Sequence, residues 1–268
     1  AMSLSKKVTI RSLKTSKTRG EKFAMVTSYD TTFARLSEEA GIECLLVGDS
    51  LGNVVQGQDS TVPVTIEDMC YHTSCVANGA NKPLIVADMP FMSYATPELA
   101  FENATALMQS GANMVKMEGG AWVAETIALL TERGIPVCAH MGLLPQSVNK
   151  IGGYRLHGKT KAEAKQLLAD AKLLEEAGAD LMLLEMVPAQ LAAQVTQKLG
   201  IPVIGIGAGN QTDAQVLVVY DLLGVSGYIP RFANNFLHSN NGSIQEALAA
   251  YATAVKDGSF PDAEHTPG

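Results

Sequence analysis

One junction recurs five times along the chain and limits what it can fold into: a helical segment, a glycine, and then a short apolar run. The five copies read "EEAGIECLLV", "QSGANMVKM", "TERGIPVCA", "EEAGADLMLL" and "QKLGIPVIG". A glycine at this point ends a helix, and a short continuous apolar run is typical of a buried strand. The repeated junction therefore predicts helix–strand units that build one parallel sheet with both faces covered.

The apolar runs and the helical periodicity between them give the expected elements. Strands are expected at Phe23–Ser28, Cys44–Gly48, Pro83–Ala87, Met114–Met117, Val137–Ala139, Leu181–Leu184, Val203–Ile206 and Val216–Tyr220. Helices are expected at Asp30–Ala40, Ile66–Asn78, Pro97–Ser110, Ala121–Arg133, Lys161–Ala177 and Ala189–Leu199. Between Gly207 and Val216 there is too little chain for a full helix, so the seventh connection is expected to be short.

Eight strands in 268 residues predict an α/β fold, a (β/α)8 TIM barrel, with an open doubly wound sheet as the alternative. No linker-like segment divides the chain, so residues 1–268 are expected to form a single domain. Residues 1–20 are interpreted as an N-terminal extension and residues 238–268 as a C-terminal helical tail. The segment from Phe232 to Val255 is predicted to be helical and to close the barrel.

Composition narrows the functional classes. A net charge of −7 argues against a nucleic-acid or anionic membrane surface, and no apolar run approaches the ~20 residues of a membrane span. The first residues lack the apolar core of a signal peptide, and Ala1-Met2 is interpreted as a cloning remainder. The four cysteines have neither zinc-ligand nor CxxC spacing, so we expect reduced thiols and a cytoplasmic location.

Ionisable residues stand at the ends of five consecutive strands, where barrel enzymes place their chemistry. They are Asp49 (followed by Ser50), Asp88, Lys116 with Glu118, His140 and Glu185. Any one of them alone is readily explained as a salt bridge or a helix cap. A buried charge costs several kcal/mol unless it is paired or coordinated, so all five strand ends together predict a functional site.

The residue types indicate the chemistry. Asp49, Asp88 and Glu118 are hard oxygen ligands that suit Mg²⁺ better than Zn²⁺. Lys116 shares a strand face with Glu118 and is placed to meet an anionic substrate, while Glu185 is free to act as a base. His140 is interpreted either as a functional group or as a support for Glu118, and both readings stay open.

Two further features are less specific. The run "GIGAGN", Gly205 to Asn210, can hold a phosphate or can let the backbone pass close to a neighbour. The loop from Leu143 to Lys159 is long for a compact domain and is a candidate lid over the mouth of the barrel.

With these residues in hand, the chain resembles the ketopantoate hydroxymethyltransferase family from Phe23 to Leu237. The matching stretches are "VGDSLG", "GQDSTVPVTIEDM", "ADMPFMSYATPE", "GANMVKMEGG", "LLEMVP" and "IPVIGIGAG", whereas "GVSGYIPRF" departs from the pattern. The resemblance implies a barrel of the phosphoenolpyruvate/pyruvate superfamily type. It also implies transfer of a hydroxymethyl group from 5,10-methylenetetrahydrofolate to 3-methyl-2-oxobutanoate through a Mg²⁺-stabilised enolate. The product would be 2-dehydropantoate, in the first committed step of pantothenate and coenzyme A synthesis.

The resemblance also assigns roles to the strand-end residues. It implies metal ligation by Asp49, Asp88 and, through water, Glu118; oxoacid binding by Asp49, Ser50, Asp88 and Lys116; proton abstraction by Glu185; and an accessory place for His140. It implies a homo-oligomer, typically a decamer. The mouth loops at Leu143–Lys159 and Tyr228–Phe236 are candidates for folate contact. The alternatives are a Mg²⁺-dependent oxoacid lyase or mutase on the same barrel, or a non-catalytic carboxylate-binding barrel.

Overall fold

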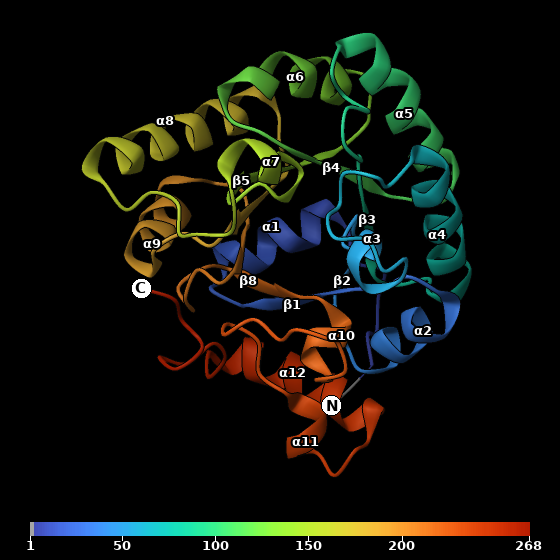
Figure 1. Cartoon of the computed structure of the whole chain (residues 1–268). Helices are drawn as coiled ribbons and strands as arrows, with labels where there is room; N and C mark the ends of the chain where they lie inside the picture. The colour runs from blue at the N-terminus through green and yellow to red at the C-terminus, as the bar shows by residue number, and fades with distance from the viewer. Residues whose placement is uncertain (1–2) are drawn as a thin grey trace.

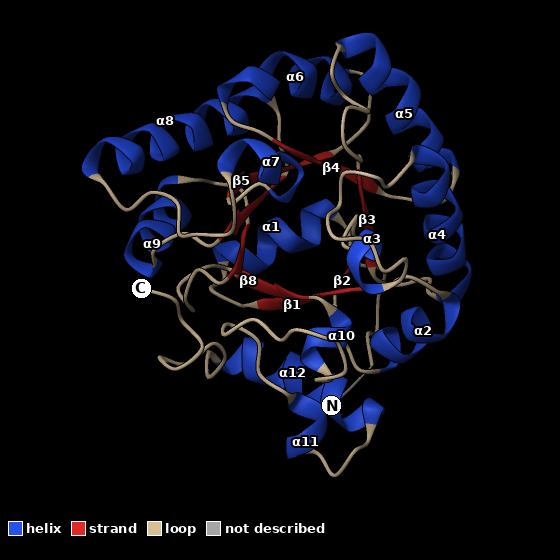
Figure 2. Ribbon diagram, in the orientation of Figure 1, coloured by secondary structure: helices blue, strands red, loops and turns tan. Residues whose placement is uncertain are grey.

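Eight parallel strands close into a barrel in the computed structural model, which describes residues 3–268 and leaves Ala1 and Met2 outside (Figures 1 and 2). Each strand pairs with its sequence neighbours and β8 pairs with β1, which excludes the open doubly wound sheet. The strands are β1 (Phe23–Thr27), β2 (Cys44–Val47), β3 (Leu84–Asp88), β4 (Met114–Glu118), β5 (Val137–Gly142), β6 (Leu181–Glu185), β7 (Val203–Ile206) and β8 (Ala214–Leu217).

Two apolar layers explain why the strands read as continuous hydrophobic runs. Alternate residues such as Met25, Leu46 and Val86 fill the interior of the barrel. Their neighbours, such as Val26 and Leu45, pack outward against the helices. Side chains alternate between the two faces of a strand, so a strand buried on both faces needs apolar residues at nearly every position.

A ring of helices surrounds the barrel (Figure 1). Its members are α2 (Thr31–Glu39), α4 (Ile66–Gly79), α5 (Pro97–Gln109), α6 (Ala124–Glu132), α8 (Lys161–Ala177), α9 (Ala189–Lys198) and α12 (Ile244–Asp257). The short elements are α3 (Leu51–Val54), η1 (Ala121–Val123), η2 (Pro145–Ser147), α7 (Val148–Ile151), α10 (Val219–Leu222) and α11 (Phe236–Ser239). Several starts are capped as the sequence suggests: the Thr96 hydroxyl accepts from the Leu99 N–H, and Pro97 begins α5.

The N-terminal extension contains a helix, α1 (Ile10–Thr18), which crosses the end of the barrel opposite the strand C-termini. Leu13 is buried with the interior side chains of the barrel, so α1 plugs this end. Lys14 and Lys17 pair with Asp180 and Asp213, at 2.7 and 2.9 Å. No helix among residues 3–268 has the length and apolarity to span a bilayer.

Several expected boundaries were wrong. The third strand runs Leu84–Asp88, so Asp88 is its last residue rather than the first residue after it. The eighth strand is Ala214–Leu217, and Val219 and Tyr220 belong to α10 instead. The tail is interrupted between α11 and α12, and no helix follows Gly258, so residues 238–268 are helical only in part. The short seventh connection is confirmed, since no helix joins β7 to β8 in the described chain.

Candidate active site

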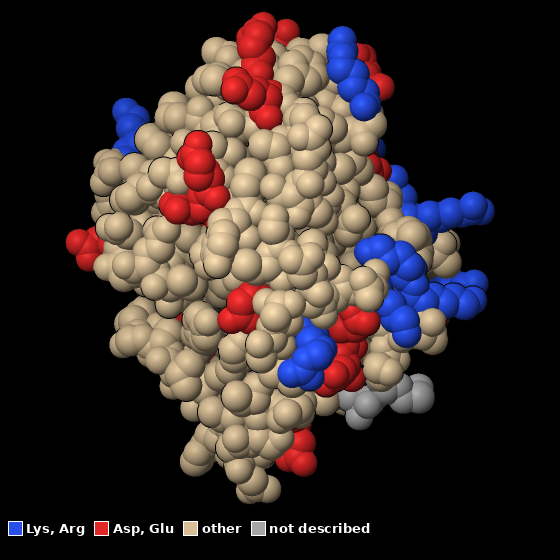
Figure 3. Space-filling view, turned by 90° about the vertical axis from the view of Figure 1, so that its right-hand side faces the viewer, with Lys and Arg blue, Asp and Glu red and all other residues tan. Residues whose placement is uncertain are grey.

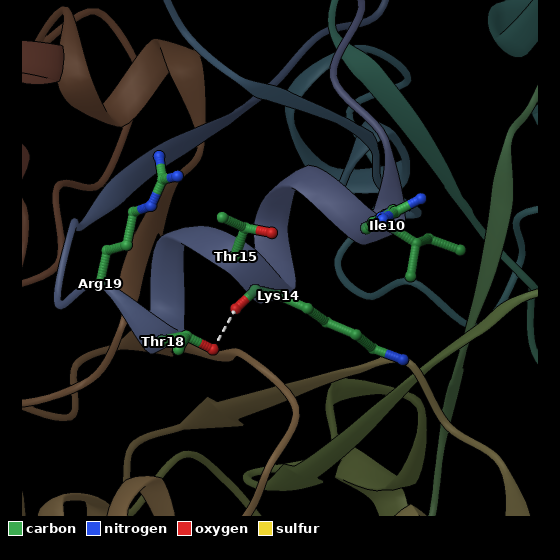
Figure 4. A pocket seen from close by; sticks show the side chains of 6 residues that line it. Ile10, Lys14, Thr15, Thr18 and Arg19 are labelled. Carbon is green, nitrogen blue, oxygen red and sulfur yellow. Dashed lines mark hydrogen bonds between the residues drawn. The ribbon is translucent and has the colours of Figure 1, made fainter.

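A cavity of about 190 Å³ opens at the C-terminal ends of the strands. All seven residues that the sequence singled out line it: Asp49, Ser50, Asp88, Lys116, Glu118, His140 and Glu185. None of the four cysteines lines it. A larger hollow lies along α1, at the opposite end of the barrel (Figure 4). Its lining comes from α1 and the following Arg19, and it contains none of the residues that the sequence singled out.

Three buried carboxylates stand on adjacent strands. Asp49 follows β2, Asp88 ends β3 and Glu118 ends β4, and each is at most 4% exposed. Asp88 Oδ2 accepts a hydrogen bond of 2.9 Å from the Asp49 N–H, which brings the first two together. Burial, with the charges of Asp88 and Glu118, raises the pKa of Asp49, and burial raises the pKa of Glu118 to about 8 against the opposing effect of Lys116. The cluster therefore favours a bound cation or bound protons.

Lys116 supplies the positive charge of the site. Its Nζ lies 3.0 Å from Asp88 Oδ1 and 2.8 Å from His140 Nδ1. Burial lowers the pKa of Lys116, but Asp88, Glu118 and Asp49 together outweigh burial and raise it, so the side chain stays charged. A buried ammonium surrounded by carboxylates is a fixed charge that an anionic substrate can meet.

His140 is a neutral bridge between Lys116 and Glu185. Burial and the Lys116 charge hold its pKa well below the ordinary value. Because an ammonium can only donate, Nδ1 accepts from Lys116, and the imidazole proton sits on Nε2. Nε2 lies 3.1 Å from Glu185 Oε2, although the angle is not that of a hydrogen bond. Burial raises the pKa of Glu185 to about 7, which suits a group that exchanges protons near neutral pH.

Ser50 reaches the cavity from the turn between β2 and α3. Its Oγ lies 2.8 Å from the Tyr29 hydroxyl, and a Cβ on Gly48 would come within 2.8 Å of the same atom. Glycine at position 48 therefore leaves room for the serine side chain to turn inward.

Sequence reasoning missed Gln146 and Tyr94, which are buried beside the carboxylates. Gln146 Nε2 donates to Asp49 Oδ2 at 2.8 Å, and its backbone N–H donates to Glu118 Oε2 at 3.0 Å. Its position in the long loop after β5 was the only available signal. Burying an uncharged amide costs less than burying a charge, so a glutamine in a loop does not stand out in the sequence as the strand-end charges do.

The glycines of "GIGAGN" serve close packing in the structure. Gly207 has φ +61°, and a Cβ there would press on Met186 and Phe232. Gly209 has φ +80° and abuts Ala189. These contacts favour the reading in which the backbone passes close to its neighbours.

The family model described as ketopantoate hydroxymethyltransferase matches residues 7–263. The chain belongs to this family. It is 59% identical over 260 residues to "3-methyl-2-oxobutanoate hydroxymethyltransferase 2" of Pseudomonas entomophila, covering 96% of this chain and 97% of that one. It is 57% identical over 261 residues to 3-methyl-2-oxobutanoate hydroxymethyltransferase of Shewanella oneidensis, covering 97% and 98%. Membership of the ketopantoate hydroxymethyltransferase family makes the protein a transferase.

Solved structures share the fold of this ketopantoate hydroxymethyltransferase family member at low identity. Phosphonopyruvate hydrolase in complex with oxalate and Mg²⁺ aligns with a TM-score of 0.60 at 13% identity, covering 96% of this chain and 93% of that one. A 2,3-dimethylmalate lyase of the PEP mutase/isocitrate lyase superfamily aligns with a TM-score of 0.57 at 20% identity, covering 78% and 80%. The expected (β/α)8 barrel fold is confirmed.

The donor atoms at the mouth fit a divalent cation. Asp88 Oδ1 is buried and pairs with Lys116 Nζ at 3.0 Å, and no protein donor among residues 3–268 hydrogen-bonds Asp49 Oδ1. Within the same residues, no three His, Cys, Asp or Glu side chains are grouped closely enough to hold a metal between them. Two direct carboxylate ligands, with water and substrate oxygens completing the shell, match what Mg²⁺ accepts.

Proposed function

We propose that this protein transfers a hydroxymethyl group from 5,10-methylenetetrahydrofolate to 3-methyl-2-oxobutanoate, giving 2-dehydropantoate for pantothenate synthesis. Family membership and the names of its close relatives support the reaction. The observation that carries the mechanism is the convergence, in one cavity, of three carboxylates, a charged lysine and a glutamate with a pKa of about 7.

Asp49 and Asp88 would hold a divalent cation, Mg²⁺ in this proposal, with Glu118 joined to it through water. When bound, the cation supplies Lewis-acid stabilisation of negative charge on the keto and carboxylate oxygens of the oxoacid. A positive charge there would also oppose the burial and the neighbouring carboxylates that raise the pKa of Asp49. The carboxylates thus make the site attractive to the ion before any substrate arrives.

The chain's own groups divide the remaining work. Lys116 and Ser50 would bind the oxoacid, with the ammonium opposing the charge that develops as C3 loses its proton. Glu185 would take that proton, because its carboxylate form is available at neutral pH. His140 would keep Lys116 in place through Nδ1, with its protonated Nε2 facing Glu185.

The transfer is favoured over the two alternatives by specific observations. A lyase or mutase shares the barrel, but the fold alone does not choose the bond that breaks. The match to the hydroxymethyltransferase family over residues 7–263 does favour one chemistry. A non-catalytic barrel would have no reason to keep a half-buried Glu185 with a pKa near neutrality facing the cavity.

Folate contact, assembly and location complete the proposal. Tyr154 and Phe232 line the cavity, one from each of the two candidate folate loops. The face over α4 and α5 is largely uncharged apart from a few acidic side chains (Figure 3) and exposes Tyr71 and Leu99, which supports a homo-oligomer. The decamer is proposed from the family resemblance alone. Four free cysteines in residues 3–268 agree with a cytoplasmic location.

The decisive experiment follows the C3 proton of 3-methyl-2-oxobutanoate by NMR in D₂O without folate. Exchange should require Mg²⁺, stop with EDTA, and fall about 10²-fold or more in Glu185→Gln. If the wild-type protein with Mg²⁺ shows no exchange of the C3 proton, tetrahydrofolate is then added to the same sample. If the wild-type protein with Mg²⁺ shows no exchange with or without tetrahydrofolate, the transferase mechanism is wrong.

A second experiment tests the ligand assignment. Asp49→Ala should keep the circular dichroism spectrum of the wild type and lose Mg²⁺-dependent turnover. Full activity in this variant would exclude Asp49 as a ligand.

A further inference from the structure

Gln146 uses every hydrogen-bonding group of its side chain inside the site. Nε2 donates to Asp49 Oδ2 at 2.8 Å and to the Met89 carbonyl at 2.9 Å, and Oε1 accepts from the Tyr94 hydroxyl at 2.6 Å. Only one amide orientation is compatible with these partners, because a flipped amide would set Oε1 against a carboxylate and a carbonyl. The amide is therefore fixed in direction as well as in position.

One residue thereby holds carboxylates from two strands. The side chain of Gln146 engages Oδ2 of Asp49, and its backbone N–H engages Oε2 of Glu118 at 3.0 Å. In each carboxylate one oxygen is committed to Gln146. Asp49 Oδ1 is left without a protein donor among residues 3–268. Gln146 therefore decides which oxygens face a cation.

Tyr94 holds the Gln146 side chain in this orientation through its hydroxyl. Its hydroxyl donates to Gln146 Oε1 and accepts from the Glu118 N–H at 3.2 Å, so it ties the amide to the end of β4. The Tyr94 ring stacks on Trp122, with centroids 6.0 Å apart and planes 11° apart. Gln146 cannot ionise, and burial raises the pKa of Tyr94 above its ordinary value, so both are uncharged at neutral pH. Neither takes part in the contacts that Lys116 makes with His140 and Asp88.

We propose that Gln146, locked by Tyr94, is a positioning residue that orients Asp49 and Glu118 for the divalent cation. This role rests on the metal site of the proposed function. Groups that orient metal ligands from outside the first layer commonly change metal affinity by about 10–100-fold when they are lost. The same range is expected here.

The test measures binding of Mn²⁺ alone, followed by the EPR signal of the free ion, with no substrate present. Gln146→Leu should bind Mn²⁺ about 10–100-fold more weakly than the wild type. The matched control is Gln166→Leu, because Gln166 is exposed on α8 and donates to an aspartate, Asp170, at 2.7 Å. The control should bind as the wild type does. Thermal melting of each variant confirms that the protein is folded at the titration temperature.

Tyr94→Phe provides an independent decision if Gln146→Leu does not fold. It removes the hydroxyl that holds Oε1 and should weaken Mn²⁺ binding about three- to tenfold, the effect of one net hydrogen bond. If Gln146→Leu folds and binds Mn²⁺ as tightly as the wild type, the positioning role is wrong and the metal site still stands. If Gln146→Leu does not fold, wild-type affinity in Tyr94→Phe leads to the same conclusion. Absence of Mn²⁺ binding by the wild type would overturn the metal site itself, and the positioning role with it.

Discussion

Lys116 Nζ lies 2.8 Å from His140 Nδ1, and both side chains are almost completely buried. The contact runs diagonally between β4 and β5, because Lys116 pairs in register with Cys138 whereas His140 pairs with Glu118. It holds a charged donor against a neutral acceptor and points the other imidazole nitrogen toward Glu185. Lys116, His140 and Glu185, from three neighbouring strands, thus lie next to one another.

Replacing Lys116 should lower activity while the barrel still folds. Lys116→Met removes the positive charge that offsets Asp88, Glu118 and Asp49. We expect kcat/KM for the oxoacid to fall by about 10²–10³-fold, the range seen when a fixed electrostatic group is lost. Steady-state kinetics measure it. The control Lys14→Met, which removes a surface ion pair with Asp180, should stay near wild type. Comparable losses in both variants would contradict the assignment.

The pH dependence of C3 proton exchange should report Glu185. Only the carboxylate form can accept a proton, and burial raises the pKa of Glu185 to about 7. Exchange should therefore be slow at pH 5, rise about tenfold per pH unit on the acid side, and level off above pH 7. Initial exchange rates by NMR from pH 5 to 9 give the profile. Glu185→Gln should be slow at every pH, and a wild-type rate that increases toward acid would rule out a carboxylate base.

How far the sequence predicts this site depends on the kind of residue. Asp49, Asp88, Lys116 and Glu185 could be found because an ionisable group at the end of a buried strand is costly without a task. Gln146 could not, since its importance arises from hydrogen bonds to residues 97 and 28 positions away. No local pattern encodes such a contact.

The same distinction applies to the fold. The glycine-marked junctions predict the barrel because each βα unit is encoded locally. Val218 to Tyr220 was misread as strand because apolar character does not distinguish a strand from the first turn of α10. The end of β8 is set instead by its pairing with β1, where Val26 lies opposite Leu217. The Val219 N–H then bonds the Thr27 hydroxyl. These partners lie far apart in the chain.

Glu118 should make the metal-free protein less stable as pH rises. Its pKa is about 8 in the fold against an ordinary 4.5, so the folded chain binds the proton more tightly than the unfolded chain does. That stabilisation is complete below about pH 4.5 and is lost as pH rises toward 8. In EDTA, the Tm of Glu118→Gln minus that of the wild type should therefore increase by about 3–6 °C from pH 5 to pH 8.

Calorimetry at the two pH values measures this difference, and Glu125→Gln on the exposed face of α6 is the control. The control should track the wild type at both pH values. Saturating Mg²⁺ should narrow the gap at pH 8, because the wild-type carboxylate then faces a cation. If the Tm of Glu118→Gln minus that of the wild type decreases from pH 5 to pH 8 in EDTA, the predicted effect of Glu118 on stability is wrong.

Comparing alanine variants at Gly142 and Gly134 separates backbone strain from crowding beside Glu185. Their φ angles are +89° and +88°, so alanine is strained to the same extent at both, by about 1–2 kcal/mol. Nothing lies near a Cβ at position 134, whereas a Cβ at position 142 would collide with the Glu185 carbonyl and Val187. That carbonyl accepts from the Leu143 N–H at 2.8 Å, so the collision displaces the end of β6.

Gly142→Ala should melt at least about 5 °C below Gly134→Ala. It should also lose about 10²-fold in C3 exchange, since small displacements of a catalytic group cost that much. Equal melting and equal exchange in the two variants would show that Glu185 is not positioned through this contact.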